Sequence, residues 1–468
     1  MSIVPHDGRR TVYLPLKELD KCAACGKTTS LRLCSSCGER IYCSPECQKG
    51  DWPTHKSICG KTDRIDLTTF YPFLALLAES HRLHPDKPLH PALTHAILNS
   101  PNPTTLPTAF PDGTSAKLVI LGEPVPQEQY ASHRWWPTAA SDFVRHKLFR
   151  RIGHEGYLVP VLTAVCVALL AEMYTTTYIP PSPSSSPSYP TPTPTQRRTR
   201  LQYRSSPIAD FGIATGPASV TPGDRLAYLN LSDDTFECGA DPSTHAWLYF
   251  TTVRGEEFAL DLGGMFLFNL CFAVPADPYG QGMLAPVRYA PAYFRDRAQA
   301  RGTPVEIMRV ERRYSVLRDE GLGEAVRWSG RKGGVAFEGE DVRRVVEFME
   351  RVGGGGGRGK VSDVEMDLTM KWCVNGCVAL GITMADRAWV KWPKEPMLAI
   401  ETDPGEMDEE EEEEGKGVSE EWFKYVRRWN KKYKKGQISK EVLGDMYRAW
   451  AKRQARAQGR EKEKEKEP

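Results

Sequence analysis

The sequence predicts a small metal-stabilised module near its start, followed by a mixed α+β body, disordered linkers and a helical charged tail. Seven of the 12 cysteines fall within residues 22–59, and the middle of the chain shows apolar patterns typical of both helices and strands. Runs rich in Pro, Ser, Gly or Glu interrupt these patterns. With 468 residues, 40% of them hydrophobic, the chain can bury cores for roughly two to four domains.

The composition also predicts where the protein resides. Its net charge of +2 excludes a uniformly acidic or basic protein. The longest apolar run, Leu158–Ala171, ends before Glu172 and is shorter than the roughly 18–20 residues of a spanning helix, so we expect no membrane segment. The first residues lack the pattern of a secretory signal. We therefore expect an intracellular protein, in the nucleus or cytoplasm with the nucleus slightly favoured, where clustered thiols hold metal more often than they pair as disulfides.

The cysteine cluster predicts two structural zinc ions. A pair of cysteines two residues apart forms a tight knuckle in which both thiolates reach one ion at about 2.3 Å, and four ligands complete a tetrahedral site. Gly26 and Gly38 follow two such pairs, where positive φ lets the chain turn back. A stretch this short buries too little apolar surface to fold alone, so metal binding would supply its folding energy. Spacing alone leaves the grouping of the ligands open; in chain order they are Cys22, Cys25, Cys34, Cys37, Cys43, Cys47, His55 and Cys59.

These residues resemble the MYND-type zinc finger. The features that match are Tyr42-Cys43 after the second knuckle, Cys47-Gln48-x-x-Asp51-Trp52-x-x-His55, and Cys59-Gly60. The resemblance covers residues 22–59 and implies a treble-cleft-like, cross-braced fold with interleaved sites. It implies that Cys22, Cys25, Cys43 and Cys47 bind the first zinc, and that Cys34, Cys37, His55 and Cys59 bind the second.

The resemblance also implies a protein-interaction role. Fingers of this type that recruit partners hold a proline-rich peptide in a shallow groove, and the matching positions are Ser35, Gln48 and Trp52. An extended proline segment has little chain entropy left to lose, and an indole face can grip it. The alternative for Trp52 is that it only packs against the small zinc core.

Residues 61–178 are predicted to be α-rich. Asp66 is placed to cap a helix that starts at Leu67, further helices are expected at Asp142–Ile152 and Leu158–Tyr174, and the run Leu118–Leu121 predicts a strand. Residues 179–206 are predicted to be a linker, because residues 180–195 contain seven Pro and eight Ser or Thr. The tract is expected to be a spacer; a sharper hypothesis is that it, or a partner's similar tract, occupies the finger's groove.

Residues 207–350 are predicted to be a mixed α+β segment with a central hairpin, made of Trp247–Val253 and Glu257–Leu262. The stretch His245–Phe250 is similar to a region of fungal MYND proteins, which implies a shared fold. Residues 353–360 read as a glycine-rich linker and residues 361–400 as a continuation of the body.

The end of the chain is strongly charged. Residues 401–417 form an acidic run that we expect to be disordered, and residues 418–468 form a basic helical tail. Within residues 422–460 there are 13 Lys or Arg against two acids, with aromatic residues recurring at helical spacing. Residues 427–435 resemble a nuclear-import or nucleic-acid patch, and the alternative is a solvated helix face.

We expect no catalytic residues and no enzyme activity. The Asn-His dipeptide of MYND-containing methyltransferases is absent from the sequence, and the cysteines outside the cluster have no histidine at metal-like spacing. The predicted function is that of a zinc-binding adaptor or transcriptional regulator whose finger binds proline-rich segments of partner proteins. The alternative is a nucleic-acid-binding regulator that acts through residues 422–460. We also expect Cys43→Ser to unfold the finger and to leave the melting of the body unchanged.

Overall fold

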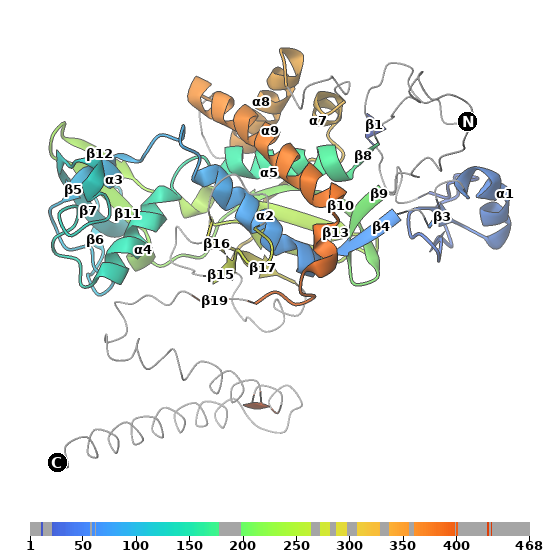
Figure 1. Cartoon of the computed structure of the whole chain (residues 1–468), viewed down its shortest axis with the longest axis horizontal. Helices are drawn as coiled ribbons and strands as arrows, with labels where there is room; N and C mark the ends of the chain where they lie inside the picture. The colour runs from blue at the N-terminus through green and yellow to red at the C-terminus, as the bar shows by residue number, and fades with distance from the viewer. Residues whose placement is uncertain are drawn as a thin grey trace. The chain divides into compact units, whose positions relative to one another are not determined.

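The structure is a computed structural model that describes residues 11–12, 21–56, 59–60, 62–176, 198–263, 272–280, 287–296, 307–327, 337–354, 360–397 and 399–400, together with Arg428, Trp429 and Lys432. The chain divides into two units, residues 1–403 and 404–468. The first unit contains the finger and the body, whose elements are labelled in Figure 1.

The described elements fall into a finger, a large sheet with helices, and a smaller sheet. The finger contains β2 (Arg32–Leu33), β3 (Ile41–Tyr42) and α1 (Pro45–His55). The body helices are α2 (Leu67–Arg82), α3 (Pro91–Thr94), α4 (Asp142–Gly153), α5 (Leu158–Met173), α7 (Glu320–Ala325), α8 (Glu340–Gly353) and α9 (Asp363–Ala385). Short strands outside the two main sheets are β1 (Thr11–Val12), β8 (Thr175–Thr176), β15 (Phe272–Pro275), β16 (Tyr289–Pro291) and β19 (Ala399–Ile400).

The large sheet has the order β17-β14-β13-β10-β9-β4, with β18 also paired to β10. Its strands are β4 (Thr62–Asp66), β9 (Arg198–Tyr203), β10 (Ser206–Gly216), β13 (His245–Thr252), β14 (Glu257–Asp261), β17 (Tyr293–Arg295) and β18 (Arg312–Ser315). The pair β13–β14 is the predicted hairpin, antiparallel and in the register Leu248 to Leu260. The outermost strand, β4, runs parallel to β9 and follows the finger directly in sequence.

Alternation along the strands separates two faces of this sheet. Phe211, Leu248 and Phe258 point into the main core, whereas Trp247 and Tyr249 belong to a smaller cluster on the other face. Successive strand residues face opposite sides, which is why the period-two pattern marked this region. The helices α2, α5 and α9 pack over the core face (Figure 1).

Helix α5 forms the centre of the core, because it is apolar all around and nearly all of its residues are buried. Helix α9 packs alongside it and places Trp372, Cys373 and Cys377 in the same core. By length and composition α9 is also able to cross a membrane, as is the bent pair α4 and α5, although half of the apolar window of α9 is buried within the structure. Polar residues interrupt the apolar residues of α9, so the longest uninterrupted apolar run of the sequence does not mark this helix.

The smaller sheet has the order β12-β11-β7-β5, with β6 paired to β7. It consists of β5 (His95–Ile97), β6 (Thr108–Ala109), β7 (Ser115–Pro124), β11 (Leu226–Asn230) and β12 (Thr235–Cys238). Its core gathers Trp135, Trp136 and residues of α4. His154, at the end of α4, connects this part to the main body through a hydrogen bond with Glu79 of α2. Tyr228 of β11 donates to Glu155, which directly follows α4.

The structure agrees with several predicted elements. Asp66 caps α2 by accepting from the amide of Thr68, the predicted strand at Leu118–Leu121 lies within β7, and α4 and α5 occupy the two predicted helical ranges.

Two segment predictions need correction. The predicted linker 179–206 contains β9, and β10 begins at Ser206, because the arginines and aromatic residues after the proline tract pair with β4 and β10. The predicted α-rich segment 61–178 also supplies β4 to one sheet and three strands to the other. The short strands β5 and β6 were missed because two or three residues are too few to show a periodic pattern, and β4 and β9 because much of their pairing joins distant parts of the chain. The proline tract 180–195, most of the predicted glycine linker 353–360 and residues 401–417 lie outside the described residues.

Candidate metal centre

Two knuckles and one helix bring the cysteines of the finger together. In each knuckle a glycine amide donates back to the carbonyl of the first cysteine, from Gly26 to Cys22 at 2.9 Å and from Gly38 to Cys34 at 2.8 Å. Both glycines have positive φ, +74° and +63°, as the tight turn requires. Cys43 follows β3, and α1 carries the remaining helical ligands Cys47 and His55.

Helix α1 starts where its sequence dictates. Ser44 is its N-cap, and the Ser44 hydroxyl accepts from the amide of Cys47 at 3.3 Å. Pro45 occupies the first turn, where its missing N–H leaves no hydrogen bond unmade. The phenol of Tyr42 donates to Asp51 at 2.8 Å and joins β3 to the middle of the helix. The local sequence therefore orients Cys47 and His55 toward the two knuckles.

The ligand atoms form two groups of four. One group is Cys22, Cys25, Cys43 and Cys47, and the other is Cys34, Cys37, His55 and Cys59; in each group the atoms lie within 4.8 Å of one another. In a tetrahedron with zinc–sulfur bonds of about 2.3 Å, neighbouring sulfurs lie roughly 3.8 Å apart. The Sγ–Sγ distances here are 3.4 Å for Cys25–Cys43, 3.6 Å for Cys43–Cys47 and 3.9 Å for Cys34–Cys59. The chain thus holds its ligand atoms at the separation that a zinc ion needs.

The imidazole of His55 is placed as a zinc ligand. Its Nε2 lies 3.4 Å from Cys37 Sγ, close to the roughly 3.6 Å expected between a nitrogen and a sulfur on one zinc ion. His55 is fully buried, and burial lowers its pKa, so the ring stays neutral as metal binding requires. The edges of Tyr42 and Trp52 enclose it, with ring centroids 6.2 Å and 5.9 Å away.

The thiols of the two groups influence one another's pKa. Although burial acts in the opposite direction, hydrogen bonds lower the pKa of Cys22 to about 6 and also lower that of Cys34. Burial, together with repulsion from Cys34 and Cys59, raises the pKa of Cys37 to about 12. Hydrogen bonding to Cys25 and Cys47 raises the pKa of Cys43 to about 12 as well. Crowded thiolates repel one another, and a divalent ion reverses this penalty because a coordinated thiol is deprotonated. All ligand positions in each group come from the protein, which is the arrangement of a structural site without an open position for water.

Comparison with known families agrees with this geometry. Residues 22–59 match the family model described as the MYND finger. This segment is a MYND-type zinc finger with two zinc sites. The same 38 residues are 47% identical to a segment of Dauer abnormal formation protein 25 of Caenorhabditis elegans, covering 8% of this chain and 10% of that relative. No solved structure matches the chain significantly.

The three predicted peptide-binding residues lie on α1 and on the knuckle that carries Cys34 and Cys37. Gln48 and Trp52 are one turn apart on α1, and Ser35 lies between the ligands Cys34 and Cys37. The amide nitrogen of Gln48 lies 3.7 Å from Cys34 Sγ, which joins the helix to the knuckle that carries Ser35. Ser35 is exposed and Trp52 retains 45% of its surface in solvent.

Three other parts of the chain were possible sites: His245, the surface of the large sheet, and the basic tail. His245 is buried and its Nε2 lies 2.6 Å from Asp261 Oδ2, the environment of a satisfied core histidine. A cleft of about 530 Å³ lies on the outer face of β13 and β14, lined by Trp247, Tyr249, Thr251, Arg254, Glu257, Arg295 and Arg313 among others. Two of these side chains, Arg313 and Glu257, already pair at 2.6 Å and 2.8 Å. The tail 422–460 is described only at Arg428, Trp429 and Lys432, where the Lys432 ammonium lies 4.2 Å from the Trp429 ring.

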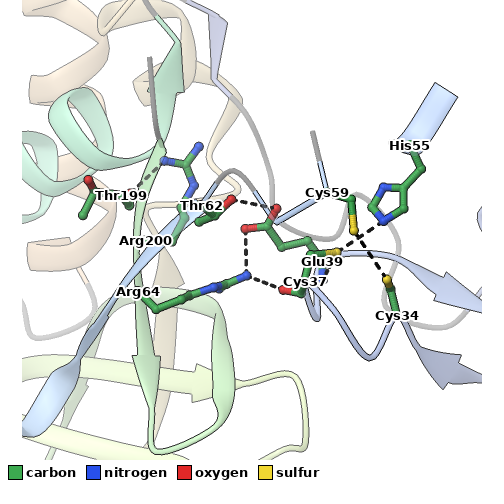
Figure 2. Close-up of polar contacts among 9 residues, drawn as sticks. All are labelled: Cys34, Cys37, Glu39, His55, Cys59, Thr62, Arg64, Thr199 and Arg200. Atoms are coloured by element: carbon green, nitrogen blue, oxygen red, sulfur yellow. Dashed lines mark hydrogen bonds and ion pairs between the residues drawn. The ribbon is translucent and has the colours of Figure 1, made fainter. Parts of the chain in front are cut away.

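The contact between the finger and the body was not predicted from the sequence. Arg64 of β4 reaches the loop after Cys37 and pairs with Glu39 at 2.9 Å (Figure 2). No motif marks this pair, since Arg64 lies 25 residues from Glu39 and outside the range of the family pattern. The only local signal is the acidic residue directly after the second knuckle.

Proposed function

We propose that the protein is an intracellular adaptor or regulator whose finger binds a proline-rich segment of a partner protein, without catalysis. The supporting observation is the surface formed by Ser35, Gln48 and Trp52, which we call the indole surface. MYND fingers are in general protein-interaction modules. An indole that stays 45% exposed on so small a domain offers apolar area to a ligand, beyond what the zinc core uses.

The geometry of the indole surface suits an extended peptide. Zinc and the cap at Ser44 fix the backbone of α1, so Trp52 is presented by a rigid element. Gln48 offers an amide one turn away, and the hydroxyl of Ser35 lies on the adjacent knuckle. Proline-rich segments dock on aromatic surfaces of this kind because their extended conformation is already formed before binding. The proline tract 180–195 of this chain is a ligand of the right composition.

The test is a peptide titration of the zinc-loaded full chain. The ligand is a synthetic peptide of residues 180–195, with a version in which every proline is replaced by alanine as its control. Trp52→Ala should abolish binding. Phe143→Ala removes an aromatic side chain with a similar exposed fraction, 46%, from α4 and should leave binding unchanged. Equal binding by wild type and Trp52→Ala would exclude the indole surface as the site.

The salt dependence of partner binding separates this function from its alternative. Binding at the indole surface involves few charges, so the affinity should change little between about 50 and 200 mM salt. Nucleic-acid binding by residues 422–460 would instead weaken steeply over the same range, because each phosphate contact releases counterions. Binding of a single-stranded oligonucleotide that is lost when residues 422–460 are removed would favour the alternative.

A further inference from the structure

The second zinc site is attached to the body through one arginine. Arg64 lies on β4, and its Nη2 donates both to the carbonyl oxygen of Cys37 and, at 2.9 Å, to Glu39 Oε1. Thr62 of the same strand donates to Glu39 Oε2 at 3.5 Å. Figure 2 shows the guanidinium of Arg64 lying between the strand and the cysteine knuckle. We call Arg64 and Thr62, together with the loop Cys37-Gly38-Glu39, the junction.

The junction contributes to stability because Glu39 is buried. Glu39 is only 3% exposed, and removing the partner of a buried carboxylate is strongly destabilising. The loop also packs tightly on the body: a Cβ atom at Gly38 would lie 2.9 Å from Pro207 Cγ of β10. Glycine is therefore required at this position for two reasons: the turn has positive φ, and Pro207 leaves no room for a side chain.

The junction acts directly on a zinc ligand. The backbone amide of Glu39 donates to Cys37 Sγ at 3.3 Å, while Arg64 binds the carbonyl of the same cysteine. Zinc bound at the second site would hold the Cys37 thiolate in position. The two groups that accept from Arg64, the carbonyl of Cys37 and the carboxylate of Glu39, would then be held in position as well. Conversely, β4 fixes Arg64 and holds the ligand loop in its metal-binding conformation. Residues that hydrogen-bond to metal ligands without binding the metal themselves orient those ligands and raise metal affinity.

Among the described residues, no hydrogen bond or ion pair joins the ligands of the first zinc site to the body. Within the part of the chain that the structure describes, the hydrogen bonds of Cys22, Cys25, Cys43 and Cys47 run only to other residues of the finger. Cys25 is exposed, whereas Cys34, Cys37 and His55 of the second site are buried. The two sites therefore differ in both exposure and attachment.

We propose that zinc at the second site and the folded body stabilise each other through the junction, and that zinc at the first site is not coupled to the body in this way. Coupling between two sites is reciprocal, so a body that holds Arg64 in place strengthens zinc binding, and bound zinc stabilises the body. The proposal does not depend on what the indole surface binds. It replaces the expectation that loss of the finger leaves the body unaffected.

The test uses Arg64→Met, which keeps much of the aliphatic stem and removes the donors. The matched control is Arg387→Met, since Arg387 also pairs with β4, at Asp63 and 3.4 Å, and has no hydrogen bond or ion pair to the described residues of the finger. Zinc transfer from the full chain to a colorimetric chelator is titrated for both of its zinc equivalents. In Arg64→Met we expect one equivalent to bind about 10–100-fold more weakly and the other to be unchanged. Arg387→Met should bind both equivalents as the wild type does.

A second measurement follows the melting of the body by tryptophan fluorescence, because ten of the 11 tryptophans lie outside the finger. Zinc removal should lower the melting temperature of the wild type and of Arg387→Met, and should lower that of Arg64→Met by less. Equal shifts in all three proteins, or unchanged zinc affinity in Arg64→Met, would overturn the proposal. If Arg64→Met does not fold, Glu39→Gln replaces it, since it removes the negative charge that pairs with Arg64 and keeps a side chain of the same shape. Wild-type behaviour of Glu39→Gln in both measurements would also overturn the proposal.

Discussion

Glu155 offers a sharp test of how the end of α4 is joined to the smaller sheet. The residue follows α4, and its Oε1 accepts a hydrogen bond of 2.6 Å from the phenol of Tyr228 in β11. Burial raises the pKa of Glu155 from an ordinary 4.5 to about 7, although the Tyr228 bond acts in the opposite direction. The folded protein therefore favours the protonated acid at this position.

The sign and size of the effect follow from this shift. Because the folded-state pKa lies above the unfolded one, the stabilising contribution is complete below pH 4.5 and is lost as the pH rises to about 7. At about 1.4 kcal/mol for each factor of ten in acidity, the loss is roughly 3 kcal/mol. Burial lowers the pKa of His81 to about 3 and that of His90 to about 4, so these two residues contribute with the opposite sign. The prediction therefore concerns the difference in the free energy of unfolding between the wild type and a variant that changes only Glu155.

The variant is Glu155→Gln, which still accepts a hydrogen bond from Tyr228 but does not titrate. The free energy of unfolding by urea is measured for wild type and variant across the range from about pH 4.5 to 8, with zinc present. The stability of the variant relative to the wild type should rise with pH by roughly 3 kcal/mol and level off above pH 7. Glu128→Gln changes an exposed glutamate and should leave the curve parallel to the wild type. Parallel curves for Glu155→Gln would refute the reasoning.

Two further predictions concern the metal and the core. Elemental analysis at pH 7 should find two zinc ions per chain, and acid should release both, because the thiolates and His55 must be deprotonated to bind; a content of one zinc or none at pH 7 would contradict the two-site assignment. Leu169→Ala should lower the free energy of unfolding by about 2–5 kcal/mol, because Leu169 is completely buried in α5. Leu106→Ala, at a position 84% exposed, should change it by less than about 0.5 kcal/mol. Similar effects of the two changes in urea denaturation would mean that α5 is not the centre of the core.

Local signals predicted much of the fold. Asp66 and Leu67 mark the start of α2, and the turn between β13 and β14 follows from two alternating runs around Arg254-Gly255. Such features depend on residues that are close in sequence, so a single segment contains all the information they need. The strand β9 was missed because most of its pairing is with β4, more than 130 residues earlier, and it pairs with β10 only next to the turn that joins them.

The zinc ligands show the same division. The eight residue types and their spacing come from the sequence, because a thiolate or imidazole has few other reasons to recur at knuckle spacing in a short segment. The grouping into two sets of four was available only through a family resemblance, and the folded finger displays it directly in the distances between ligand atoms. The indole surface likewise needed the fold, since the exposure of Trp52 depends on how α1 packs.

By itself, then, the sequence determined that residues 22–59 bind two zinc ions, because coordination chemistry is written in residue type and short-range spacing. Only the tertiary structure decided that the finger is attached to the body. The contact of Arg64 with Glu39 and the fit of Gly38 against Pro207 exist only once the strands have paired. The physical reason is that a buried ion pair and a close backbone approach depend on positions in space, which residues distant in the chain acquire only on folding.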